Sequence, residues 1–240
     1  MLFFLIRHGD PIYDPDSLTP LGHRQAEALA KRLAVYGLDE VYTSTSNRAM
    51  LTAKPTCELL KLEAKPLDFA NERYTWADLT VEREDGKPGV TWLFYNKRTV
   101  SLFNSKEIRD LGDRWYDHPD LASHNYKKGI DRVYDATDEF FAGFGYEHER
   151  FTGKYKTNDP SGKRVALFAH QDFGLVFLSC LLDIPYPMIS THFDICPTGM
   201  TVIEFQNFGE FAIPKVLTHS SDSHLYRDGL PLVYNGGPRF

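Results

Sequence analysis

Apolar and polar positions follow the rhythm of an α/β protein along most of the chain. Short apolar runs of strand length alternate with longer stretches in which apolar residues recur every three or four positions, the spacing of an amphipathic helix. Alternating strands and helices favour parallel strand pairing. We therefore expect a three-layer sandwich, with a mostly parallel central sheet and helices on both faces. The pattern predicts strands at residues 1–7, 40–43, 64–69, 164–169, 200–206 and 211–217, and helices at residues 19–36, 47–61, 126–145 and 172–182.

Residues 73–125 interrupt this rhythm. The three tryptophans, Trp76, Trp92 and Trp115, all lie in this segment, together with five other aromatic residues and many charges. We interpret it as a helical or irregular cap inserted into a single domain that spans residues 1–240. Its aromatic residues either line a pocket for an organic ligand or form the small core of the insertion itself. The sequence leaves both interpretations open.

Length and composition limit the classes of function. A chain of 240 residues with 42% apolar content can bury one substantial core, and its formal net charge of −6 disfavours a nucleic-acid partner. No apolar stretch approaches the length of a membrane span, and the run at residues 1–6 is too short for a signal peptide. Cys57, Cys180 and Cys196 lack paired metal-ligand spacing and indicate reduced thiols. We expect a cytoplasmic protein without nucleic-acid or membrane partners, and the oligomeric state is left open.

Two of the predicted strands each end on a histidine. His8, within Arg7-His8-Gly9, follows the first apolar run, and His170 follows the run at residues 164–169. The carboxyl ends of parallel strands meet at one edge of a sheet, where ligands bind. A lone histidine at such a position is more often a packed core residue, but two of them favour a shared binding site.

A third element supplies positive charge. The strand at residues 40–43 runs into a cluster of serine, threonine and asparagine, and Arg48 falls in the first turn of the following helix. The N-terminus of a helix attracts anions, and a guanidinium binds phosphate in bidentate fashion. The backbone N–H groups of this helix start and the guanidinium of Arg48 together predict an oxyanion site that suits phosphate. The alternative is that Arg48 is a solvated residue in a capped helix.

These segments, in this order, resemble the histidine phosphatase superfamily, which includes the cofactor-dependent phosphoglycerate mutases. The resemblance implies that His8 is the nucleophile, that Arg7, Arg48 and His170 bind the transferred phosphoryl group, and that a carboxylate donates a proton. The matching parts are Arg7-His8-Gly9, Thr19-Pro20-Leu21-Gly22 followed by Gln25-Ala26, Thr43-Ser44 through Arg48-Ala49 with Thr52-Ala53, and the strand that ends on His170.

The implied chemistry is transfer of a phosphoryl group to His8. Neighbouring cations disfavour an imidazolium, so the nucleophilic nitrogen is available near neutral pH. A phosphohistidine forms, and water hydrolyses it. We expect a phosphomonoesterase that acts on a small phosphorylated organic substrate and needs neither a metal ion nor a cofactor. Gly9, which permits close backbone approach, and Gln171, which follows His170, are expected to bind substrate.

Two carboxylates compete for the role of proton donor. Glu72 lies in Asn71-Glu72-Arg73-Tyr74, which resembles the family stretch where mutases carry their acid. Asp10 directly follows Gly9, at a position where the family usually has Glu or Gln, and an aspartate reaches less far. We therefore rank Glu72 first and Asp10 second. A plain surface role for Glu72 is the remaining alternative.

Two other activities stay open. The window Asp10-Pro11-Ile12-Tyr13 departs from the mutase continuation, which has a Glu, a Trp and an Asn, so hydrolysis is preferred over a bisphosphate-dependent phosphoglycerate mutase. A catalytically silent member would bind phosphorylated ligands without turning them over. Such members typically lose a site residue, whereas both histidines, both arginines and a carboxylate are present here. The identity of the substrate is not predicted.

Overall fold

The first apolar run of the chain lies at the centre of one sheet. In the computed structural model, which describes residues 1–122, 124–232 and 234, β1 (Leu2–Arg7) lies between β10 and β11. The strand order is β5-β4-β10-β1-β11-β12-β9-β8. The other strands of the sheet are β4 (Glu40–Ser44), β5 (Ala64–Leu67), β8 (Tyr146–Glu149), β9 (Lys154–Thr157), β10 (Arg164–Ala169), β11 (Met200–Asn207) and β12 (Phe211–Ser221).

Parallel pairing is concentrated in the half of the sheet that contains β1. Strands β5, β4, β10 and β1 pair in parallel, whereas β1–β11, β11–β12, β12–β9 and β9–β8 are antiparallel. The predicted α/β class with a parallel core is confirmed. The sequence analysis missed β8 and β9, because each is only four residues long and carries charged residues at alternate positions.

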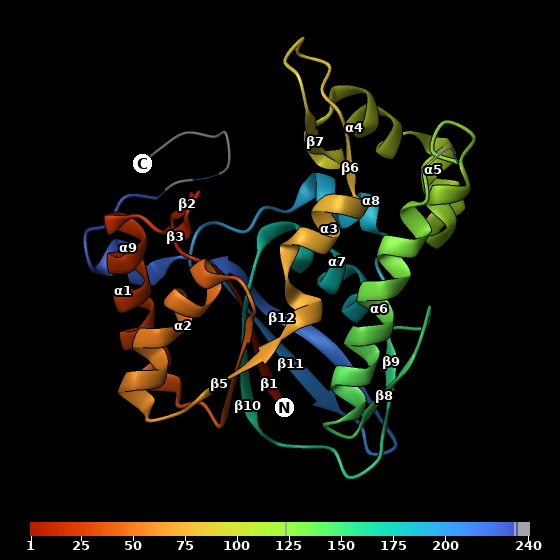
Figure 1. Ribbon diagram of the computed structural model, residues 1–240. Coiled ribbons are helices and arrows are strands. Elements are labelled where there is room, and N and C mark those ends of the chain that lie inside the picture. Colours follow the sequence, from red (N-terminus) through yellow and green to blue (C-terminus); the bar gives the residue numbers. More distant parts are fainter. Residues whose placement is uncertain (123, 233, 235–240) are drawn as a thin grey trace.

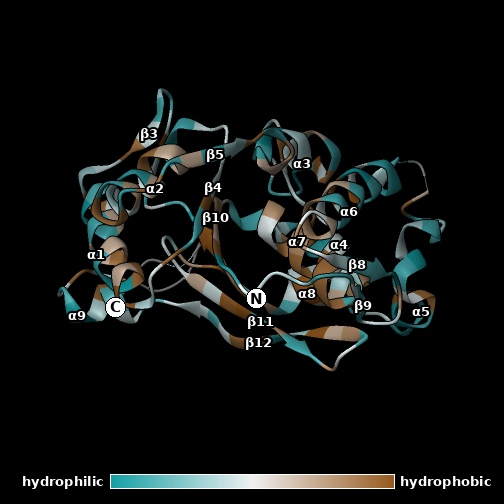
Figure 2. Cartoon of the chain, turned by 90° about the horizontal axis from the view of Figure 1, so that it is seen from below, coloured by the Kyte–Doolittle hydropathy of each residue, from teal (hydrophilic) through white to brown (hydrophobic). Residues whose placement is uncertain are grey.

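Helices cover both faces of the sheet, as predicted (Figure 2). Phe3 and Leu5 of β1 belong to one apolar core, and Phe4 and Ile6 belong to the other. A parallel strand that is buried on both faces needs such a continuous apolar run. One face carries α1 (Pro20–Tyr36), α2 (Asn47–Leu60) and α9 (Ser223–Arg227), and the other carries α3 (Glu72–Asp78), α6 (Tyr126–Ala142), α7 (Gln171–Leu182) and α8 (Tyr186–His192).

The remaining elements lie near the carboxyl end of β1 (Figure 1). A short hairpin follows β1 directly, and the segment that broke the predicted rhythm forms a second hairpin and several short helices. None of the helices in the described part of the chain has the length and apolarity to cross a membrane. These elements are β2 (Pro11–Tyr13), β3 (Asp16–Leu18), η1 (Asp68–Ala70), β6 (Thr80–Glu82), β7 (Val90–Trp92), η2 (Leu93–Tyr95), α4 (Lys97–Phe103), α5 (Lys106–Leu111) and η3 (Gly112–Asp117).

The three tryptophans divide between core and surface. Trp115 is 1% exposed and packs between Phe103, at 5.2 Å between ring centroids, and Tyr126, at 5.9 Å. Trp76, by contrast, is 40% exposed and meets the edge of Trp92 at 4.7 Å. Trp115 therefore builds the core beneath the insertion, while Trp76 and Trp92 face a pocket that is described below.

Candidate active site

The parallel pairing of β1 with β10 brings the two predicted histidines together. Arg7 lies opposite Ala169 in the register, and the amide of His8 donates to the carbonyl of Ala169 at 3.0 Å. The imidazoles of His8 and His170 emerge at the same edge of the sheet, with ring centroids 5.2 Å apart. Both residues are 1% exposed. A single small ligand can therefore touch both rings.

The backbone selects the tautomer of His8. Nδ1 lies 2.7 Å from the carbonyl oxygen of Gly9, which only accepts hydrogen bonds, so Nδ1 carries the proton. The lone pair of the ring is then on Nε2. Burial lowers the pKa of His8 well below its usual range, and the charges of Arg7 and Arg48 lower it further. His8 is therefore a neutral base at physiological pH.

His170 is held in the opposite tautomer. Its Nδ1 lies 3.0 Å from Nη2 of Arg48, which only donates, so Nε2 carries the proton and donates to Oγ of Ser44 at 2.8 Å. Burial lowers the pKa of His170 well below its usual range, and the neighbouring His8, Arg48 and Arg7 act in the same direction. Ser44 lies at the end of β4, the next parallel strand. His170 is thus fixed by two neighbouring elements.

Arg48 lies in the first turn of α2, as predicted, and connects three parts of the site. One guanidinium nitrogen, Nη1, donates to Oδ1 of Asp16 at 2.9 Å, and Nη2 donates to Oε2 of Glu72 at 3.0 Å. Asp16 also accepts the backbone N–H of Asn47 at 2.7 Å. The sequence analysis missed Asp16, because its partners lie more than thirty positions further along the chain and no local pattern connects them.

Arg7 and Gly9 are held by close backbone contacts. Nη1 of Arg7 donates to the carbonyl of Ile195 at 2.6 Å, which ties the guanidinium to the loop before β11. At Gly9, a Cβ atom would lie 2.7 Å from the carbonyl oxygen of Gly22. Only a glycine lets this loop pack against the first turn of α1. The close approach at Gly9 is thus made by Gly22, and the role of Gly9 in substrate binding stays a prediction.

Glu72, rather than Asp10, contacts the histidine and arginine cluster. Oε2 of Glu72 lies 3.6 Å from Nδ1 of His170, in addition to its bond with Arg48. The carboxylate of Asp10 instead accepts the hydroxyl of Thr19 at 2.7 Å, at the N-cap of α1. Asp10 is therefore engaged in holding the start of α1.

A second carboxyl group, which the sequence analysis did not single out, lies behind Glu72. The backbone N–H of Asp172 donates to Oε1 of Glu72 at 3.2 Å, and the Tyr186 hydroxyl donates to Oδ1 of Asp172 at 2.8 Å. Burial is the main cause that raises the pKa of Asp172 to about 8. The charge of Glu72 raises this pKa further, and the hydrogen bond from Tyr186 lowers it by less than burial raises it. Asp172 is therefore mostly protonated at neutral pH.

Gln171 lies next to His170 and is 8% exposed. Its amide nitrogen donates to Oδ1 of Asp194 at 2.5 Å, and its amide oxygen lies 3.5 Å from the Tyr95 hydroxyl. Gln171 thus connects the start of α7 to the insertion and to the loop before β11.

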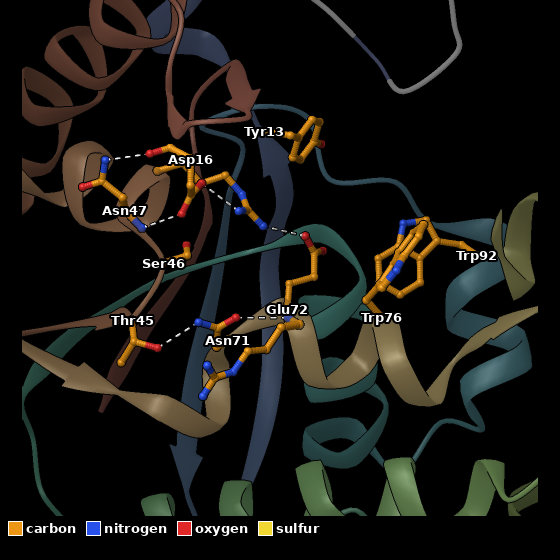
Figure 3. Close-up of a pocket in the computed structure, with 11 residues that line it drawn as sticks. Tyr13, Asp16, Thr45, Ser46, Asn47, Asn71, Glu72, Trp76 and Trp92 are labelled. Carbon is orange, nitrogen blue, oxygen red and sulfur yellow. Dashed lines mark hydrogen bonds and ion pairs between the residues drawn. The ribbon is translucent and has the colours of Figure 1, made fainter. Parts of the chain in front are cut away.

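A pocket of about 670 Å³ opens beside this cluster (Figure 3). Arg48 and Glu72 belong to both the cluster and the pocket, so a ligand that touches them can extend into this space. Three aromatic side chains line the pocket, and the rest of the lining is polar. Its residues are Tyr13, Asp16, Thr45, Ser46, Asn47, Arg48, Asn71, Glu72, Arg73, Trp76 and Trp92.

Two groups of described residues have ligand atoms close enough to share a metal ion. One is His8, Glu72 and His170, and the other is Asp138, His148 and Cys180. In the first group the Arg48 guanidinium contacts both His170 and Glu72, an arrangement that suits an anion better than a cation. In the second, Asp138 is already neutralised by His148 and by Arg150.

Comparisons with known proteins agree on one family and one fold. A family model described as histidine phosphatase superfamily (branch 1) matches residues 3–129. No curated protein sequence matches the chain. Among solved structures, a phosphoserine phosphatase from Entamoeba histolytica, in complex with 3-phosphoglyceric acid, is 17% identical with a TM-score of 0.58, covering 93% of this chain and 98% of its own.

Two further solved structures share the fold. A mycobacterial glucosyl-3-phosphoglycerate phosphatase is 16% identical with a TM-score of 0.55, and the alignment covers 90% of this chain and 97% of that one. The alpha-ribazole phosphatase from Shigella flexneri is 17% identical with a TM-score of 0.54, covering 92% and 97%. At such low sequence identities these similarities show a shared fold.

Proposed function

This chain belongs to the histidine phosphatase superfamily, and we propose that it is a phosphomonoesterase that acts through a phosphohistidine at His8. One observation carries the proposal. A neutral His8, with its proton held on Nδ1 by Gly9, lies beside His170, the buried Arg7 guanidinium and the partly buried Arg48 guanidinium, at the end of three parallel strands. A nucleophile surrounded by fixed donors suits phosphoryl transfer, in which positioning and charge stabilisation supply most of the catalysis.

Three side chains bind the phosphoryl group in this proposal. Arg7 and Arg48 supply permanent positive charge, and His170 supplies a further contact from the end of the neighbouring parallel strand, β10. The three equatorial oxygens gather negative charge during transfer, so each fixed donor lowers the barrier. Gly9 and Gln171 complete the phosphate end of the site, Gly9 by keeping the loop close to α1 and Gln171 by its amide at the start of α7.

The reaction proceeds in two balanced steps. Nε2 of His8 attacks phosphorus, the N–P bond forms and the ester P–O bond breaks, and the leaving alkoxide takes a proton from the Glu72 carboxyl. Water then attacks phosphorus, the N–P bond breaks, and Glu72 takes the proton of the water. The products are the alcohol and inorganic phosphate. This route uses groups of the chain alone, so we propose that the activity is independent of metal ions.

The proposal includes a small substrate and a cytoplasmic setting. A pocket of about 670 Å³ suits a small organic leaving group, within the ~300–1,000 Å³ usual for ligand sites. Cys57, Cys180 and Cys196 are free thiols, in keeping with a reducing compartment. In the domain description that we propose, residues 73–125 form a cap on a single domain, with Trp76 and Trp92 beside the reaction site.

Turnover of an aryl phosphate, with trapping of the phosphoenzyme, tests the proposal. We expect His8→Ala to abolish turnover, and the exposed His23→Ala to retain it as a matched control. Mass spectrometry of the acid-labile adduct should place phosphate on His8. Label on another residue, or turnover that survives His8→Ala, contradicts the mechanism. Interconversion of 3-phosphoglycerate that depends on a bisphosphate identifies a mutase instead, and added chelator tests metal independence.

The role of Glu72 has its own test. Glu72→Gln keeps the size of the side chain but cannot donate an acidic proton. We expect it to slow esters of poorly leaving alkyl alcohols by about 10²-fold or more, and activated aryl esters far less, since those need little protonation. Equal losses for both ester types remove Glu72 as the proton donor, and Asp10→Asn is the comparison variant.

A further inference from the structure

The pocket beside the catalytic cluster has an aromatic side that the phosphoryl chemistry does not use. Tyr13 comes from the end of β2, Trp76 from α3 and Trp92 from the end of β7, and all three line one space (Figure 3). Trp76 and Tyr13 are 40% and 67% exposed, so both rings are accessible to a ligand in this space. Segments that are distant in the sequence thus supply rings to one wall.

Two of these rings pack against each other, and one of them also packs against Phe94. Trp92 stacks on Phe94 at 5.9 Å with 9° between the planes, and the edge of Trp92 meets Trp76 at 4.7 Å and 88°. Tyr13 lies over the guanidinium of Arg48 at 5.4 Å. Aromatic surfaces fixed in this way favour flat partners, because stacking and edge-to-face contacts need defined ring orientations. A flexible aliphatic chain gains less from such a wall.

The charged residues of the pocket are already paired. Arg48 binds Asp16 and Glu72, and Arg73 binds Asp68 at 3.2 Å. In the proposed function Arg48 binds the transferred phosphoryl group, so a second phosphate or a carboxylate on the alcohol would meet Arg73 and would have to compete with Asp68 for it. The pocket therefore disfavours an anionic leaving group and accepts a neutral one.

The opposite wall offers neutral hydrogen-bonding groups. It contains Thr45, Ser46, Asn47 and Asn71, and the Asn71 amide donates to the hydroxyl of Thr45 at 2.9 Å. Hydroxyls and amides of this kind suit ring nitrogens, carbonyls and sugar hydroxyls. A flat, uncharged group with polar edges matches both walls.

We propose that Tyr13, Trp76 and Trp92 select phosphate monoesters whose alcohol carries an uncharged planar ring. This inference rests on the proposed function, because it assigns the leaving-group side of the same site. The phosphate lies on Arg48 beside Glu72, and the ring extends along the aromatic wall. A nucleoside 5′-monophosphate and benzyl phosphate both represent this class, whereas ribose 5-phosphate, ethyl phosphate and 3-phosphoglycerate do not.

Matched ester pairs test the selection. Adenosine 5′-monophosphate and ribose 5-phosphate share a primary alcohol, as do benzyl phosphate and ethyl phosphate, and each pair differs by a planar ring. We expect kcat/KM to be at least about tenfold higher for the ester with the ring, which corresponds to about 1.4 kcal/mol. Trp76→Ala should bring both ratios close to one, while Trp76→Phe keeps most of the preference. Tyr226→Ala, at an 87% exposed position, is the control.

A binding measurement separates this inference from the proposed function. His8→Ala protein is titrated with the same two pairs by calorimetry, so that the preference is measured without turnover. Tighter binding of the esters with a ring, lost in His8→Ala/Trp76→Ala, supports the selection even where no ester is hydrolysed. Equal binding and equal kcat/KM for both members of each pair overturn it, and leave the phosphatase proposal standing if the aryl phosphate is hydrolysed.

Discussion

Helix α7 begins beside the buried pair His8 and His170, and it ends beside a third histidine, His148, which lies between two aspartates. His170 is its N-cap and Asp183 its C-cap, and the twelve residues between them span about 18 Å. At the first end, His8 and His170 are neutral, with pKa values well below the usual range. At the second end, Asp183 lies 3.2 Å from Nε2 of His148, and Asp138 lies 2.8 Å from Nδ1.

Burial acts in the same direction at both ends. It lowers the pKa of His148 as it does that of His8, but hydrogen bonds and charges from Asp138 and Asp183 outweigh it and raise the pKa to about 9. The Arg7 and Arg48 charges add to burial at the other end. The sign of the neighbouring charge therefore decides whether a buried histidine is a neutral base or a fixed cation.

The pKa values of the buried carboxyl groups also differ between the two ends of α7. Asp138 and Asp183 face His148, and hydrogen bonds from that ring outweigh burial and lower their pKa values. Asp172, at the active-site end, has Tyr186 and Glu72 as neighbours, and burial raises its pKa to about 8. One end of α7 is thus an ionised network, and the groups at the other end are mostly uncharged at neutral pH.

Replacement of the charged histidine should have the largest effect. His148→Gln leaves Asp138 and Asp183 without their shared cation, and we expect the free energy of unfolding to fall by about 3–5 kcal/mol. Turnover per folded molecule should stay near that of the wild type. Urea denaturation followed by circular dichroism measures the loss, and the exposed His23→Gln should change stability by less than about 0.5 kcal/mol. Loss of activity without loss of stability would contradict the division between the two ends.

The corresponding change at the active-site end should show the opposite profile. His170→Gln removes the imidazole that lies beside His8 and accepts the hydrogen bond of the Arg48 guanidinium, and we expect kcat to fall by about 10²-fold, or about 2.7 kcal/mol. Its unfolding free energy should fall less than that of His148→Gln, because no ion pair is broken. Steady-state kinetics on an aryl phosphate measure the change in kcat, and urea denaturation measures the change in the free energy of unfolding. A larger loss of stability for His170→Gln than for His148→Gln would break the comparison.

The pH dependence of stability should show the smallest effect. The folded pKa of His148 is raised from 6.5 to about 9, so its contribution is complete below pH 6.5 and is lost as pH rises through 9. Between pH 7.5 and 10 the wild type should lose about 2 kcal/mol that His148→Gln does not lose, at about 1.4 kcal/mol per pKa unit. Arg150 and Cys180 also face Asp138, so Cys180→Ser is the control for thiol titration. A constant difference between the two proteins across this range would contradict the charged state of His148.

The candidate site at the N-terminal end of α7 was largely predictable from sequence, because its residues follow strands. His8 and His170 each come directly after an apolar run, and parallel pairing of those runs fixes their proximity. Arg48 follows β4 in the same way. These positions depend on local pattern and sheet topology, and both are visible in the order of residues.

The other features depend on contacts that no local pattern encodes. Asp138, His148 and Asp183 come from α6, β8 and the end of α7, and only the packed fold brings them together. Likewise, the separation of Trp76 from Trp115 depends on which side of the insertion faces the core. Neither the contacts of His148 nor the burial of each tryptophan follows from a residue spacing that can be recognised in the sequence alone.

The backbone contact between Gly9 and Gly22 has a practical meaning for protein engineering. A Cβ at Gly22 would lie 2.3 Å from the carbonyl oxygen of Asp10, and one at Gly9 would meet Gly22 itself. Any side chain at either position forces the loop that follows His8 away from the first turn of α1. A combinatorial library aimed at new substrates should therefore keep both glycines constant and diversify positions 13, 76 and 92.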